Sequence, residues 1–222
     1  MNVDQSEAER AAGTSTPIAF VNMTALVENA RLIVEEVGTD LVLDLRANAW
    51  GFGADRVASV LRDVGLEASR FTGAPHPGLT ERLYGLGDER SASVLSLHGT
   101  VLSVKPLLRG EGVSYGFRHR ASTDTNVALV TGGYAQGIVR ALGNQAYVTV
   151  AGARCPIVGR VAMDVSVIDV SHHPVRRGDT VVYLGDSALG ETSLRDWCAM
   201  TGLNVREIVA GILTRARTEH HS

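Results

Sequence analysis

A run of short, β-branched segments between Leu95 and Gly185 constrains the fold more than any other feature of the sequence. We predict strands at residues 94–104, 113–119, 127–130, 147–150, 155–158, 165–170 and 180–184. Valine, isoleucine and tyrosine favour strands, and the glycine-containing pairs between these segments favour tight turns. Strands of this length and spacing are typical of a small, curled all-β domain.

The segment before this region has a different pattern. A short strand at 18–21 precedes a helix that begins after the predicted N-cap Asn22 and carries an apolar stripe from Leu26 to Val37. There follow a strand at 41–45, a loop at 46–53, a helix with its buried face at 57–64, and a strand at 68–71. These residues amount to about two β/α units, which would begin a parallel sheet.

The two ends of the chain complete this prediction. Residues 1–16 are small and polar, so we expect a disordered tail. Ser193 is a predicted N-cap, and Asn204 lies at capping-box spacing from Glu207, so two helices are expected after the strands. Residues 218–222 are expected to be a frayed end.

The composition excludes several classes of protein. With a net charge of −3 and a pI near 6.2, no basic surface for nucleic acid is expected. The two cysteines, Cys155 and Cys198, match no metal-ligand spacing. No stretch approaches the ~18 apolar residues of a membrane span. We therefore expect a cytoplasmic protein whose partners include no metal, nucleic acid or membrane.

Five short motifs occur in a fixed order along the chain. They are Arg46-Ala-Asn-Ala-Trp-Gly-Phe-Gly53, His76-Pro-Gly-Leu-Thr-Glu-Arg-Leu-Tyr-Gly85, Gly110-Glu-Gly-Val-Ser-Tyr-Gly116, Gly133-Tyr-Ala-Gln-Gly-Ile-Val-Arg140 and Gly159-Arg-Val-Ala-Met-Asp164. In this order they resemble motifs of the alanine racemases, which are pyridoxal 5′-phosphate (PLP) enzymes that pair a (β/α)8 barrel with a β domain. The resemblance covers nearly the whole chain.

This resemblance implies an α+β fold. A C-terminal, all-β, barrel-like domain of the alanine racemase type would follow a truncated β/α remnant of the N-terminal barrel. Residues 17–85 would form the remnant, and residues 86–222 the β domain with its terminal helices. A complete (β/α)8 barrel takes about 250 residues. The remnant is far shorter, so most of the barrel would be missing between Thr72 and His76.

The sequence departs from the family where the resemblance places the cofactor. Arg46 stands at the position of the lysine that forms a Schiff base with PLP, and a guanidinium stays protonated and cannot replace an amine. Trp50 and His220 stand where the family has tyrosines that contact the cofactor phosphate. The site is therefore degenerate, and no cofactor is expected unless the family activity persists, in which case it would be PLP.

Two further residues bear on this site. Asp44 lies two residues before Arg46, a spacing that would let the two side chains form an ion pair on one side of the strand. The alternative is that Asp44 faces solvent at a sheet edge. Lys105 is the only lysine among the 21 basic residues, but it lies in a predicted strand and is not expected to anchor PLP.

Other family residues are retained. The resemblance makes Tyr115 the second catalytic base, which acts in the partner subunit's site, and places Met163 and Asp164 at the substrate pocket. Each also has a structural reading. Tyr115 would be a hairpin aromatic, Met163 a core residue, and Asp164 an acceptor for turn amides.

These observations lead to three hypotheses for function. The first is an alanine-racemase-like protein that is not catalytic alone and acts as a homodimer, or as a heterodimer with a full-length alanine racemase to which it donates Tyr115 and Met163. The second is a PLP-dependent alanine racemase, an isomerase that interconverts L- and D-alanine for D-alanine biosynthesis, with an unusual architecture. The third is a β domain repurposed as a binding module.

Overall fold

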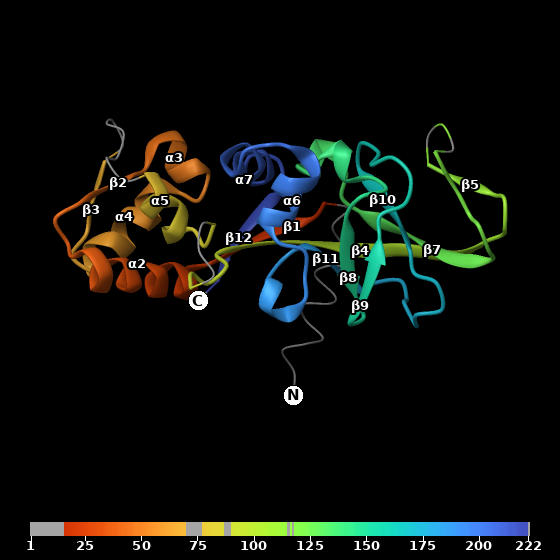
Figure 1. Cartoon of the computed structure of the whole chain (residues 1–222), viewed down its shortest axis with the longest axis horizontal. Helices are drawn as coiled ribbons and strands as arrows, with labels where there is room; N and C mark the ends of the chain where they lie inside the picture. The colour runs from red at the N-terminus through yellow and green to blue at the C-terminus, as the bar shows by residue number, and fades with distance from the viewer. Residues whose placement is uncertain (1–15, 70–76, 87–89, 115, 117, 222) are drawn as a thin grey trace.

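One long strand, β4 (Leu95–Leu107), organises the molecule in the computed structural model, which describes residues 16–69, 77–86, 90–114, 116 and 118–221. Figure 1 shows β4 running from the helical part of the molecule into the β-rich part. It pairs antiparallel with three strands: β1 (Ile18–Asn22), β7 (Thr125–Thr131) and β11 (Thr180–Leu184). β4 therefore connects the N-terminal strand β1 with β7 and β11 of the β-rich part.

The large sheet has the order β10-β7-β4-β11-β8-β9, with β1 also on β4 and β12 on β1. Its remaining strands are β8 (Tyr147–Val150), β9 (Ala153–Pro156), β10 (Val165–Asp169) and β12 (Arg217–His221). Only an isolated bridge between Ile157 and Ile168 and a hydrogen bond from the Val158 amide to the Val167 carbonyl join the two ends of this order among the described residues. The domain is thus a curled, open sheet rather than a closed barrel.

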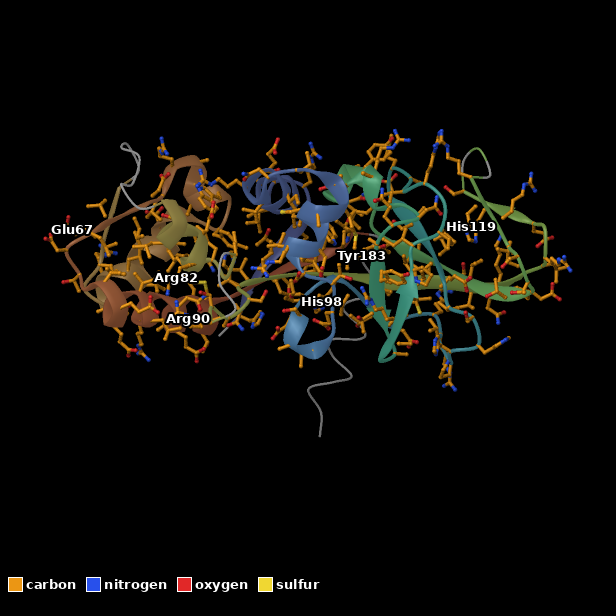
Figure 2. The ribbon with its side chains drawn as sticks, in the orientation of Figure 1. Glu67, Arg82, Arg90, His98, His119 and Tyr183 are labelled. Atoms are coloured by element: carbon orange, nitrogen blue, oxygen red, sulfur yellow. The ribbon has the colours of Figure 1, made fainter. Side chains whose placement is uncertain are left out.

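The residues of β4 explain how it packs closely between its neighbouring strands. Leu95, Leu97 and Val101 alternate inward and are buried. Gly99 lies between them, where a Cβ atom would be 2.5 Å from the Thr131 carbonyl oxygen and 2.8 Å from the Tyr183 ring. Only glycine allows this close approach of two strands. Figure 2 labels Tyr183 near the middle of the molecule.

A small hairpin extends from the far end of the sheet. It consists of β5 (Gly112–Val113) and β6 (His119–Arg120), and its buried residues form a second hydrophobic cluster with the ends of β4 and β7. Figure 2 places His119 at this end. The prediction of one strand over 113–119 was wrong, because the chain turns at Ser114 and Gly116, which have positive φ angles.

The helical part begins with α2 (Met23–Val37), which Asn22 caps by accepting a hydrogen bond from the Ala25 amide, as predicted. It continues with β2 (Val42–Asp44), α3 (Arg46–Trp50), α4 (Ala54–Asp63), β3 (Glu67–Ser69) and α5 (Pro77–Leu83). β2 and β3 pair in parallel, as two β/α units require. β1, however, lies in the large sheet. The division of the chain at residue 85 stays a prediction.

Polar contacts fasten this part to the sheet. The buried side chain of Asn29 in α2 donates hydrogen bonds to the carbonyls of Leu83 and Ala92 and accepts one from the Ala92 amide. Arg82 and Arg90, neighbours in Figure 2, both form ion pairs with Glu36. These contacts hold α2 against the chain that leads into β4.

Two further helices follow the sheet. α6 (Leu194–Thr201) and α7 (Val205–Leu213) each begin at a capping box, on Ser193 and on Asn204 as predicted. Three short 3₁₀ helices lie in the loops: η1 (Tyr134–Gln136), η2 (Arg140–Leu142) and η3 (Ser187–Leu189). None of the helices in the described part of the chain is long and apolar enough to cross a membrane.

Several local predictions differ from the structure. The segment 218–222 was expected to fray, but Arg217–His221 forms β12 because it pairs in parallel with β1. The turn-rich segment before residue 85 contains α5, which begins at Pro77. Val37 was assigned to the buried stripe of α2 but is 49% exposed. The predicted disordered tail lies outside the described residues except for Thr16, and so does the end of the strand at 68–71.

Candidate functional site

A left-handed turn lies at the start of the first motif. Ala47, Asn48, Ala49 and Trp50 have φ angles of 53° to 57°, within the segment that was expected to be a loop. Such a conformation costs roughly 1–2 kcal/mol for each non-glycine residue. The Asn48 side chain stabilises the turn by accepting a hydrogen bond of 2.9 Å from the Ala54 amide. Strain of this kind is characteristic of functional segments.

The predicted ion pair between Asp44 and Arg46 is confirmed. The Arg46 Nη2 atom lies 2.7 Å from Asp44 Oδ2, and Arg46 Nε lies 3.0 Å from Oδ1. Asp44 is only 6% exposed, so the alternative of a solvent-facing carboxylate is wrong. The hydrogen bond from Arg46 lowers the pKa of Asp44. The Arg46 guanidinium, at the position that the resemblance gives to the cofactor lysine, is thus held in a bidentate pair.

Aromatic rings fill the space beside this turn. The Phe52 ring stacks on the Tyr84 ring at 4.3 Å, and the Trp50 ring lies 5.1 Å from Tyr84. Arg206 of α7 covers Trp50, with its guanidinium carbon 4.8 Å from the ring centre, and pairs with Glu81 at 3.1 Å. The first two motifs contain these aromatics, but no local pattern in the sequence connects Arg206 with them.

Tyr84 is an unusual member of this aromatic cluster. Its side chain is fully buried, and its hydroxyl has no hydrogen-bond partner among the residues that the structure describes. Burial raises the pKa of Tyr84, and the nearby Asp44 carboxylate raises it further. The hydroxyl therefore stays protonated, and it carries the penalty of an unmade hydrogen bond.

The C-terminal elements close the cluster from the other side. The His220 Nε2 atom lies 3.2 Å from the Phe52 carbonyl oxygen. A Cβ atom on Gly51 would be 2.7 Å from the Leu213 Cβ atom, so only glycine fits there. The structure therefore brings Arg46, Trp50 and His220 to one cluster.

The residues of this cluster do not fit the cofactor that the resemblance implies. PLP needs an amine for its aldehyde and donors for its phosphate. Arg46 offers only a guanidinium that Asp44 already binds, and Trp50 is buried under Arg206. His220 directs a ring nitrogen at the Phe52 carbonyl. No reaction step is therefore assigned to PLP here.

The retained residues lie in the β-rich part. Tyr115 is outside the described residues, but its neighbour Ser114 is fixed, since its hydroxyl donates to the Arg160 carbonyl at 2.7 Å and accepts from the Arg160 amide at 3.0 Å. Met163 is 55% exposed, so its assignment to the core is wrong. Asp164 accepts a 2.7 Å hydrogen bond from the Gln136 side chain rather than from a turn amide.

Close backbone contact positions these loops. A Cβ atom on Gly133 would lie 2.2 Å from the Met163 carbonyl oxygen, so the Gly132-Gly133 loop and the Met163 loop touch directly. The Tyr134 and Ala135 amides donate hydrogen bonds to the carbonyls of Ala162 and Met163. The exposed side chain of Met163 is therefore presented on a firmly held loop.

Comparison with known proteins gives two kinds of similarity. The family model "Alanine racemase, C-terminal domain" matches residues 94–220. The alanine racemase of Mycobacterium tuberculosis is 38% identical over 139 residues, 60% of this chain and 36% of that protein. The alanine racemase of Mycobacterium leprae is 37% identical over 147 residues, 63% of this chain and 37% of that protein. The matched part spans about a third of the length of these curated relatives.

Solved structures show the same fold. The alanine racemase of Bartonella henselae, with covalently bound pyridoxal phosphate, gives a TM-score of 0.80 at 16% identity, covering 93% of this chain and 99% of that chain. The alanine racemase of Bacillus anthracis with bound L-Ala-P gives 0.79 at 16% identity, covering 93% and 95%. The α+β fold expected from the motifs is confirmed.

Proposed function

The chain belongs to the alanine racemase family, because that family's C-terminal domain model matches residues 94–220, and we propose that it acts by associating with another chain rather than as a racemase on its own. The partner is a second copy of the chain or a full-length alanine racemase. The chain spans only about a third of its curated relatives, so their activity does not transfer to it directly.

The Asp44–Arg46 pair is the observation that carries this proposal. Three hydrogen bonds of 2.7 to 3.1 Å join the two side chains at the position that the resemblance gives to the cofactor lysine. An arginine in such a pair stays charged and cannot attack an aldehyde. A chain with this pair would need another source of the amine, which a full-length racemase would supply.

The β-rich part supports the same proposal. Met163 is exposed on a fixed loop, and Tyr115 follows Ser114, whose hydroxyl is bound at both its donor and its acceptor side. In the family these positions serve the partner subunit's site. A tyrosine works as a base near neutral pH only in a cationic environment, because its usual pKa is ~10. Tyr115 would therefore act only when a partner provides that environment.

The test is to mix the purified chain with a full-length alanine racemase. We expect a complex by size-exclusion chromatography with light scattering, and a change in the racemisation rate. Met163→Glu should weaken the complex at least tenfold, since it places a charge at the centre of the proposed contact. Leu189→Glu is the matched control, because Leu189 is 76% exposed and belongs to a different loop, η3. Absence of both a complex and a rate change, with a chain that is also monomeric by itself in light scattering, would contradict the proposal.

The alternative of a working racemase has one observation in its favour. Lys105, the only side-chain amine in the chain, lines a pocket in the β-rich part. If this alternative holds, the pure protein would carry covalently bound PLP. The visible absorbance of the protein would vanish on borohydride reduction, and the protein would racemise alanine without a partner chain. Lys105→Ala would abolish all three properties.

A further inference from the structure

A pocket of about 270 Å³ lies between the large sheet and the small hairpin. One side of the pocket consists of three adjacent strands, β4, β7 and β10, and the opposite side consists of β5 and Ser114. The lining residues are Ser103, Lys105, Gly112, Val113, Ser114, Val127, Leu129 and Val167. None of its lining residues belongs to the aromatic cluster at Arg46.

Strand register explains why these residues meet. Ser103 of β4 pairs with Leu129 of β7, which pairs with Val167 of β10, so the three lie in one row across the sheet. Lys105 pairs with Val127 in the next row on the same face. The floor of the pocket is therefore apolar and the β4 side is polar.

The polar side chains of the pocket differ in whether they have partners. The Ser114 hydroxyl is bound to Arg160 at both its donor and its acceptor side. Within the described part of the chain, no ion pair or hydrogen bond is found for the Lys105 ammonium or the Ser103 hydroxyl, and both residues are exposed. These two groups on one strand are available to a ligand.

The acidic residue in the row of Lys105 does not neutralise the Lys105 ammonium. Asp169 of β10 lies in the row of Lys105 and Val127, but on the far side of Val127. Its Oδ1 atom accepts hydrogen bonds from the Thr125 hydroxyl at 2.7 Å and the Ser171 amide at 2.8 Å. Two strand spacings of about 4.8 Å separate the Lys105 and Asp169 positions. The pocket thus presents one cation beside an apolar wall.

We propose that this pocket binds a small monocarboxylate with a short, branched aliphatic body. The carboxylate would accept hydrogen bonds from the Lys105 ammonium and the Ser103 hydroxyl. The aliphatic body would lie against Val113, Val127 and Val167. The volume is at the small end for ligand pockets, which typically measure about 300–1,000 Å³, so a molecule of a few carbons fits better than a nucleotide.

A single lysine also selects against phosphate ligands. Phosphate sites commonly gather several backbone N–H groups, arginines or a helix N-terminus. Here one ammonium and one hydroxyl face a wall of valine and leucine. Inorganic phosphate is therefore the discriminating competitor in the test.

The unique lysine makes the test direct. Reductive methylation with ¹³C-formaldehyde labels only Lys105 and the α-amine, and it preserves the positive charge. Titration with 3-methylbutanoate should shift the Lys105 methyl resonance with saturation, at a Kd on the order of millimolar for so small a ligand. The α-amine resonance should not move, and 3-methylbutan-1-ol should bind at least tenfold more weakly.

Substitution gives the second arm of the test. In protein whose amines have not been methylated, the backbone amide resonances of Gly112 and Val127 should shift over the same range of 3-methylbutanoate concentration. Lys105→Met should weaken binding at least tenfold, whereas Arg177→Met, which removes an exposed cation outside the pocket, should leave it unchanged. A shift that does not saturate, an equal response to inorganic phosphate, or unchanged binding in Lys105→Met would each overturn the proposal. The outcome does not depend on whether the chain associates with a racemase.

Discussion

Two buried tyrosines, one in the sheet and one in the helical part, have opposite hydrogen-bonding states. Tyr183 of β11 is fully buried, and its hydroxyl donates a 2.9 Å hydrogen bond to the Thr131 carbonyl. Tyr84, after α5, is equally buried, and within the described part of the chain its hydroxyl has no hydrogen-bond partner. The buried tyrosine hydroxyl of the sheet is thus hydrogen-bonded, whereas the one in the aromatic cluster is not.

The comparison extends to what each region presents to solvent. The charged groups near Arg46 are already engaged within the cluster, since Asp44 binds Arg46 and the Arg206 guanidinium lies on the Trp50 ring. The sheet region leaves Met163 and Lys105 available. We infer that the helical part serves mainly as packing and that any binding function lies in the loops and the pocket of the sheet. Four measurements can break or sharpen this comparison.

The largest effect is expected for Phe52→Ala. The Phe52 ring is almost fully buried and stacks on Tyr84, so its loss should lower the free energy of unfolding by about 3–5 kcal/mol in urea denaturation. Phe20→Ala is the matched control on the sheet. Phe20 is partly exposed, so its loss should cost about half as much or less. Equal losses would mean that the two regions are packed alike.

The pH dependence of stability should separate the regions next. Burial, together with His221, lowers the pKa of His98 to about 4 from 6.5. Between these values the unfolded chain binds a proton that the folded chain does not, so stability is complete above pH 6.5 and falls as the pH drops toward 4. The loss reaches about 3 kcal/mol at most.

Substitution of His98 isolates this contribution. His98→Phe should flatten thermal stability between pH 6.5 and 4, whereas His173→Gln, at an exposed turn, should not. The helical part behaves differently, because the pKa of Asp44 is lowered by Arg46, so its contribution is present above pH ~4 and is lost only in stronger acid. A pH profile of His98→Phe identical to that of the parent chain would contradict this assignment.

Removal of each tyrosine hydroxyl tests the opening comparison directly. Tyr183→Phe should cost about 1–2 kcal/mol, because it leaves the buried Thr131 carbonyl without its donor. Tyr84→Phe should be neutral or stabilise by up to about 1 kcal/mol, because it removes an unpaired polar group. Chemical denaturation of the two variants gives both numbers, and destabilisation by Tyr84→Phe would show that its hydroxyl has a function.

The smallest effect is expected at the ion pair. Asp44→Asn should lower the free energy of unfolding by about 1 kcal/mol, since Arg46 is half exposed and can regain water. Arg46→Lys should lower the free energy of unfolding by a similar amount, because an ammonium is a point charge and cannot form the bidentate pair with Asp44. Thermal unfolding of both variants measures this, and a loss of several kcal/mol would mean that the pair holds the left-handed turn together.

The sequence predicted the regions in which local pattern decides structure. β8 and β11 have the predicted bounds because β-branched residues alternate between turns. The helix caps at Asn22, Ser193 and Asn204 follow from side-chain hydrogen bonds within four residues. Kinship was predicted because several motifs occur in order.

Contacts between distant residues account for what was missed. β12 is a polar segment that becomes a strand only because β1 offers it a free edge. The covering of Trp50 by Arg206 joins residues that no local pattern connects. Five of the candidate residues lie in the described part of the chain, namely Arg46, Trp50, His220, Met163 and Asp164. The contacts of Asp164 with Gln136 and of Gly51 with Leu213 depend on loop and helix packing, which no local pattern predicts.

The parallel pairing of β12 with β1 affects how the chain reaches its fold. Ile18 lies opposite Arg217, so β1 has to wait for a partner strand that leaves the ribosome much later than β1 itself. Contacts across so many residues form slowly, and unpaired strand edges recruit other chains in the meantime. A nascent or proteolytically shortened chain that ends before Arg217 would expose the outer edge of β1 and is expected to aggregate unless a chaperone covers it.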